Sequence, residues 1–165
     1  MGRQGNWREE RGFTLIEVMA TIVVMGILFT IATFTWTRAA ESRRVDSATN
    51  QVVADLRLAH TQATNRLTDS SFVVPADSVP AGVDPLSTYL VGPPGDLDTM
   101  RLPGDDQGIP KTKILTATTI TFHSDGGADI NPAGDITVTT TDGDPNDPSH
   151  TIEINPITSR VKVVD

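Results

Sequence analysis

The chain has 165 residues, of which 38% are hydrophobic, and this length predicts a single domain with appended segments. Its net charge of −8 repels nucleic-acid phosphates unless its few cations gather on one face. Cysteine is absent, which excludes a disulfide framework, a thiolate metal site and a thiol nucleophile.

The first predicted element is an apolar run from Phe13 to Trp36, in which Glu17 is the only formally charged side chain. Roughly 18 or more largely apolar residues are typical of a membrane-spanning helix, whereas a secretory signal has an apolar region of only about 7–15 residues. We therefore predict a polar head over 1–12 and a transmembrane helix over 13–36. Arginines in the head favour a cytoplasmic N-terminus, but Arg38, Arg43 and Arg44 follow the run, so charge alone leaves the orientation open.

The carboxylate of Glu17 needs a partner, because a charged side chain inside a membrane helix costs about 2.5–3.5 kcal/mol on insertion scales. Two partners are open to it. One is the N-terminus of its own helix, where anions are favoured. The other is a cation on a neighbouring subunit.

The stretch "RGFTLIEVMATIVVMGIL" resembles the processing signal of type IV pilins and type II secretion pseudopilins. A polar leader ends in Gly12, Phe13 follows, and Glu17 is the fifth residue after the leader. The resemblance implies that a prepilin peptidase/N-methyltransferase cleaves between Gly12 and Phe13 and methylates the new amine of Phe13. It also implies that this amine pairs with Glu17 of an adjacent pilin or pseudopilin subunit, which would set the register between helices as a buried polar group does in a coiled coil.

An amphipathic continuation is predicted over 37–70, with the helix ending near Arg66. Apolar residues recur there at spacings of three and four, which is typical of a helix with one buried face; they are Val45, Ala48, Val52, Leu56, Ala59, Ala63 and Leu67. His60 lies beside this stripe and is interpreted as a boundary residue. The segment "VVADLRLAHTQATNRLTDSSFVV" resembles the GspH/FimT family of minor pilins, with His60 in place of the usual arginine.

The C-terminal part, 71–165, is predicted to be a β-rich domain containing a Pro/Gly-rich loop over 75–111. This loop holds seven of the eleven prolines, and "STYLVG" is its one candidate strand. The segments "TKILTATTITFHS", "DITVTTTD", "TIEINP" and "RVKVVD" alternate β-branched and polar residues and predict antiparallel strands. "INPAGD" and "DGDPNDPS" are interpreted as turns. A helix followed by a sheet favours an α+β fold.

The final strands extend the resemblance to the GspH/FimT family. "ITFHSDGGADINPAGDITV" and "HTIEINPITSRVKV" are similar to that family's last strands, although Ser159 stands where the family usually has glycine. The implied fold is pilin-like, with one long N-terminal helix packed on a C-terminal antiparallel sheet.

No constellation of residues indicates an enzyme or a cofactor. His123, Ser124 and Asp125 are consecutive, whereas a catalytic triad is assembled from separate segments, so we interpret "FHSD" as a strand end and a turn. Asp142, Asp144, Asn146 and Glu153 have the spacing of calcium-loop ligands, but Asp147 replaces the glycine of that loop. We interpret this stretch as an acidic hairpin turn rather than a metal site.

DNA capture is the main alternative to a structural role, because some members of the family that the chain resembles bind DNA through basic residues near the C-terminus. Arg160 and Lys162 lie there on the same side of a strand. Two cations in so acidic a chain favour only salt-sensitive contact, and nucleic acid is not the partner we predict.

The predicted function is that of a minor pilin or pseudopilin, a structural subunit of a type II secretion pseudopilus or type IV pilus. It would span the membrane once, with its N-terminus cytoplasmic and its C-terminal domain outside the cytoplasm. The alternatives are a DNA-binding minor pilin and a plain signal-anchored binding domain.

Overall fold

The computed structural model describes residues 13–75, 87–102, 111–141 and 146–164. The chain divides into two compact units, Met1–Arg38 and Ala39–Asp165. One helix, α1 (Leu15–Arg66), contributes its first part to the first unit and its second part to the second.

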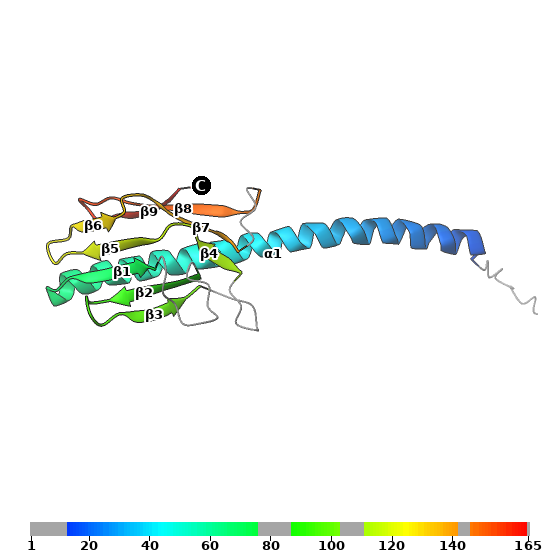
Figure 1. The fold of residues 1–165 in the computed structure, drawn as a ribbon. Helices are drawn as coiled ribbons and strands as arrows, with labels where there is room; N and C mark the ends of the chain where they lie inside the picture. Colours follow the sequence, from blue (N-terminus) through cyan, green and yellow to red (C-terminus); the bar gives the residue numbers. More distant parts are fainter. Residues whose placement is uncertain (1–12, 76–86, 103–110, 142–145, 165) are drawn as a thin grey trace, which may run out of the picture. The chain divides into compact units, whose positions relative to one another are not determined.

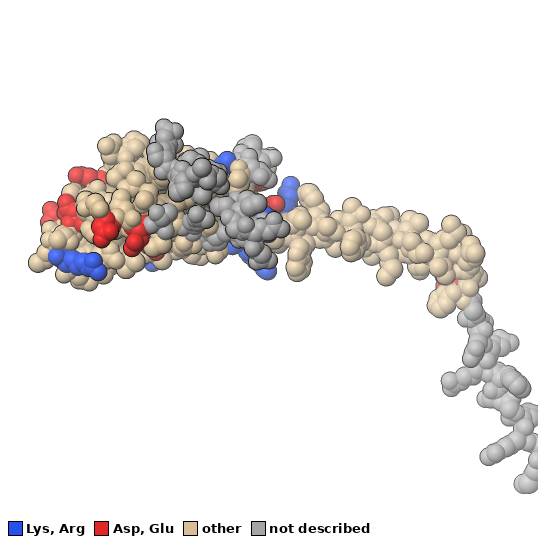
Figure 2. Space-filling model, turned by 60° about the horizontal axis from the view of Figure 1, so that its bottom comes forward, with Lys and Arg blue, Asp and Glu red and all other residues tan. Residues whose placement is uncertain are grey.

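The first part of α1 is apolar and exposed along its length. An 18-residue window has a mean hydropathy of 2.4 and no buried residue, so the helix is long and apolar enough to cross a membrane. Charged side chains are nearly absent from this surface (Figure 2). Its threonine hydroxyls donate to carbonyls of the preceding turn, as Thr30 does to Gly26 at 2.9 Å and Thr33 to Phe29 at 2.8 Å. Such bonds satisfy a hydroxyl inside its own helix, which makes threonine compatible with a lipid-facing surface.

The second part of α1 forms the centre of the hydrophobic core. Six of the seven residues of the predicted stripe are buried, from Val45 to Ala63, and Thr49 and Val53 are buried with them. The seventh, Leu67, was predicted wrongly: it is 77% exposed and has a φ of 53°. The helix has ended at Arg66, and Leu67 takes the left-handed conformation that commonly closes a helix, which turns its side chain away from the stripe.

Two antiparallel sheets cover this part of the helix (Figure 1). The first has the order β3-β2-β1-β5-β6, with β1 (Ser70–Val74) at its centre. Its other strands are β2 (Thr88–Gly92), β3 (Asp98–Arg101), β5 (Thr118–Phe122) and β6 (Ala128–Asn131). The second has the order β4-β7-β8-β9 and consists of β4 (Thr112–Ile114), β7 (Ile136–Thr140), β8 (Ser149–Ile154) and β9 (Val161–Val164).

The α+β prediction is confirmed, but the single expected sheet is two sheets. The segment "TKILTATTITFHS" is divided at residues 115–117: β4 pairs with β7, and β5 pairs with β1 and β6. "STYLVG" forms β2 as predicted, whereas β3 and β6 were missed, and the first two residues of the predicted turn "INPAGD" belong to β6. The sequence of β3, "DTMR", lacks the β-branched alternation that indicates a strand.

The hairpin from β2 to β3 depends on the glycine at the end of β2. Gly92 has a φ of 150°, and a Cβ built there would lie 2.4 Å from the carbonyl oxygen of Asp96. The Asp96 N–H in turn donates to the Pro93 carbonyl at 3.0 Å. Any side chain at Gly92 would therefore clash with the turn that brings β3 to β2.

Tyr89 anchors the first sheet to α1. Its ring is fully buried and stacks on Phe72, with ring centroids 4.8 Å apart. Its hydroxyl donates to Asp55 Oδ2 at 2.5 Å and accepts from Gln51 Nε2 at 3.1 Å. Burial, followed by the bond to Asp55, raises the pKa of Tyr89, so this hydroxyl remains a donor.

Candidate functional site

The start of α1 places a carboxylate one turn into an apolar helix. Thr14 precedes the first helical residue, and its Oγ1 accepts from the Glu17 N–H at 3.3 Å. The Thr14 carbonyl also accepts from Glu17 at 3.1 Å and from Val18 at 3.2 Å. Thr14 is therefore the N-cap, and Glu17 occupies the third helical position, where the helix dipole favours a negative charge.

Processing would act immediately before this cap. Phe13 is described and is 82% exposed, whereas Gly12 lies outside the described residues. Cleavage between them and methylation of Phe13 therefore stay predictions. The Thr14 cap was missed in the sequence, although threonine followed three residues later by glutamate before an apolar run is the capping-box signal that could have identified it.

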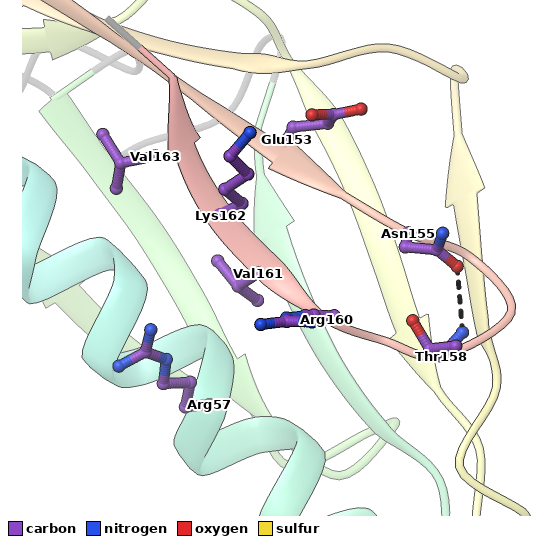
Figure 3. Close-up of a pocket in the computed structure, with 8 residues that line it drawn as sticks. All are labelled: Arg57, Glu153, Asn155, Thr158, Arg160, Val161, Lys162 and Val163. Atoms are coloured by element: carbon purple, nitrogen blue, oxygen red, sulfur yellow. Dashed lines mark hydrogen bonds between the residues drawn. The ribbon is translucent and has the colours of Figure 1, made fainter.

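A second candidate site is a groove of about 740 Å³ between α1 and β9 (Figure 3). Arg57 lines it from α1, and Arg160 and Lys162 line it from the start of β9. Glu153 of β8 lies opposite Lys162 in the strand register. Three cations thus meet one carboxylate here, in a chain whose net charge is −8.

Arg160 and Lys162 were the candidate DNA contacts, and the structure adds Arg57 to them. The sequence contains no local signal for this, because about a hundred residues separate Arg57 from the two others. Their proximity depends on how β8 and β9 pack along α1.

Two of the four residues with calcium-loop spacing lie within the described part of the chain. Asp142 and Asp144 lie outside the described residues, and Asn146 lies in the turn that precedes β8. Glu153 is an exposed residue next to the end of β8 and lines the groove. Within the described ranges no group of three or more His, Cys, Asp or Glu residues could hold a metal ion.

The "FHSD" segment is a strand end and a turn. His123 follows β5, and its partners are Asp69 (Nδ1 to Oδ1, 3.2 Å) and Asp129 (Nε2 to Oδ2, 3.1 Å). Asp125 instead accepts from the Gly127 N–H at 2.9 Å, as an acidic residue in a turn commonly does. Hydrogen bonds to Asp129 and Asp69 raise the pKa of His123.

Comparison with known proteins yields two family matches. The family model described as the prokaryotic N-terminal methylation motif matches residues 7–33. The family model described as the type II transport protein GspH matches residues 48–158, which is more than half of the chain. No curated protein and no solved structure gives a significant match.

Proposed function

Because this chain belongs to the type II transport protein GspH family and is a minor pseudopilin or pilin subunit, we propose that it enters its filament through the carboxylate of Glu17. The observation that carries the proposal is the position of Glu17. It is the only formally charged residue from Phe13 to Trp36, and it lies in the first turn of an exposed apolar helix.

Processing would supply the charge that Glu17 needs. Cleavage between Gly12 and Phe13 by a prepilin peptidase/N-methyltransferase leaves a cationic amine at the start of the apolar segment. Lipid around this segment offers no water to solvate either charge. Pairing the amine of one subunit with Glu17 of the next neutralises both, and a charge pair of this kind defines one axial register between neighbouring helices.

Capping of its own helix is the competing role for Glu17. At the third helical position, a glutamate can stabilise the free N–H groups of the first turn without any second subunit. Glutamine keeps this hydrogen-bonding capacity but carries no charge. The two roles therefore predict different behaviour for a glutamine variant.

The test compares Glu17→Val and Glu17→Gln with the unaltered protein in cells that assemble the filament. All three chains should be found in the membrane, since the apolar segment is intact. Both variants should be lost from the sheared filament fraction, because neither carries the negative charge. Thr21→Val, one turn further along, changes a polar group without removing charge and should enter filaments normally.

Normal incorporation of Glu17→Val would overturn the proposal. Normal incorporation of Glu17→Gln alone would assign Glu17 to helix capping. In either case the chain would still be a member of its family, but the pairing between subunits would have to involve other groups.

The β-rich unit is the part of the subunit that we propose to lie outside the cytoplasm, held by a single membrane-spanning helix. The family is structural rather than catalytic, in line with the absence of a catalytic constellation in the sequence. A plain signal-anchored domain is less favoured, because the methylation-motif match covers residues 7–33, where the leader meets the helix.

A further inference from the structure

The outer edge of β9 is an open strand edge in the second unit. It has no role in the proposed entry into the filament through Glu17. β9 is the last strand of its sheet, and no strand in the described part of the chain pairs with its outer side. The Asn155 N–H donates to the Arg160 carbonyl at 3.0 Å, so main-chain groups at 160, 162 and 164 face β8. In an antiparallel ladder the intervening residues, Val161 and Val163, then direct their N–H and C=O groups to the open side.

Side chains along this edge alternate in character. Val161 is buried and Val163 is 38% exposed on one face of the strand, while Arg160 and Lys162 are exposed on the other. An added strand would place its own side chains beside these, one face against valines and one against cations. Arg57, which approaches from α1, supplies a third cation on the opposite wall of the groove (Figure 3).

We propose that this groove receives an extended segment with alternating acidic and aliphatic residues from a neighbouring subunit, added as a strand to β9. Main-chain bonds to Val161 and Val163 would hold the segment, and carboxylates beside Arg160 and Lys162 would select it. Strand addition of this kind takes its affinity from the main chain and its specificity from alternate side chains. The identity of the partner as a neighbouring subunit rests on the proposed function.

Charge disfavours two other occupants. Pairing of β9 with β9 of a second copy would place Arg160 and Lys162 beside the same cations, and like charges directly opposite one another are destabilising. Nucleic acid would bring phosphates next to Glu153 and into the field of an acidic chain. A short acidic peptide brings fewer charges and can use the open main-chain edge, which a nucleic acid cannot.

The test uses the full chain in detergent micelles and a fluorescent peptide of alternating valine and glutamate flanked by serines. We expect saturable binding by fluorescence anisotropy at low salt. Arg160→Glu/Lys162→Glu should weaken binding about tenfold or more, since two attractive contacts become repulsive. The control Arg43→Glu/Arg44→Glu makes the same change in net charge on α1, away from the groove, and should bind like the unaltered chain.

Two further peptides separate strand addition from simple charge attraction. A valine–lysine peptide should bind the Arg160→Glu/Lys162→Glu chain and not the unaltered one. A valine–glutamate peptide with N-methylated main-chain nitrogens keeps its charge but cannot donate to the β9 edge, and it should fail to bind.

Three results would overturn the proposal: no saturable binding of the acidic peptide, equal binding of its N-methylated form, or displacement of the peptide by a single-stranded oligonucleotide at lower concentration. The last result would assign the three cations to nucleic acid. None of these outcomes involves Glu17, so failure here is distinguishable from failure of filament entry.

Discussion

At the scale of the residue, His123 is a side chain whose charge state depends on two neighbouring carboxylates. Its ring lies between Asp69, which follows α1, and Asp129 in β6, and the ring itself follows β5. One imidazole therefore connects three parts of the second unit. Both carboxylates favour its protonated form.

The raised pKa of His123 predicts a pH-dependent contribution to stability. A histidine whose pKa is higher folded than unfolded stabilises fully below its ordinary pKa of about 6.5, and this stabilisation is lost as pH rises through the folded pKa. As the pH is raised from about 6.5 through the pKa of folded His123, the melting temperature of the unaltered chain should therefore fall more than that of His123→Gln.

An NMR titration of the His123 ring measures the same effect directly. Its pKa should lie above about 6.5 and should decrease in Asp129→Asn and, separately, in Asp69→Asn. A pKa at or below the ordinary value, or identical pH profiles for the unaltered chain and His123→Gln, would contradict the assignment.

At the scale of the element, α1 changes its environment along its length while remaining one helix. Up to Arg38 its apolar residues are exposed on all sides, and after it only one stripe is apolar and buried. The pattern of apolar residues differs accordingly: an almost continuous run suits lipid, and spacings of three and four suit a core on one side.

Two leucines in α1 test this division within the second unit. Leu56 is completely buried, whereas Leu58, two residues further on, is 45% exposed. Leu56→Ala should lower the free energy of unfolding by about 2–5 kcal/mol, because it removes buried methyl groups and leaves a cavity. Leu58→Ala makes the same chemical change on the outer face and should cost less than about 1 kcal/mol.

Urea unfolding of the two variants, followed by circular dichroism in the same detergent, measures the difference. Equal losses for Leu56→Ala and Leu58→Ala would mean that the face of α1 that packs against the sheets has been misidentified.

At the scale of the whole molecule, the chain combines an apolar helical segment long enough to cross a membrane with a β-rich unit that forms its own core. Removal of the leader would alter this molecule in two ways. It would take away a net charge of about +1 and create a new amine at Phe13. Both changes act at the end of the apolar segment, where Glu17 lies.

Processing is predicted to be complete in cells that contain a prepilin peptidase. Intact-mass measurement of the purified protein should find a chain that begins at N-methylated Phe13. Deletion of the peptidase, or the variant Gly12→Val in its presence, should leave the leader attached. A protein that retains residues 1–12 although the peptidase is present would contradict the prediction.

A feature of the fold could be predicted from the sequence where residues close together in the chain indicate it. The membrane segment, the buried stripe of α1, strand β2 and the strands of the final hairpin are all indicated by neighbours within a few residues. Leu67 was predicted wrongly and strands β3 and β6 were missed, because the positive φ of Leu67 and the hairpin pairing of the two strands override local propensity. The Thr14 cap is also marked locally, by a threonine three residues before a glutamate.

The sequence by itself determined a long helix followed by strands, the buried stripe of that helix up to Ala63 and the carboxylate in the apolar segment, because hydrophobic periodicity acts over one or two turns. Only the tertiary structure decided that residues 112–122 serve two sheets and that Arg57 lines one groove with Arg160 and Lys162. These arrangements join residues far apart in the chain. They depend on strand pairing and on packing against α1, for which no short stretch of sequence carries a pattern.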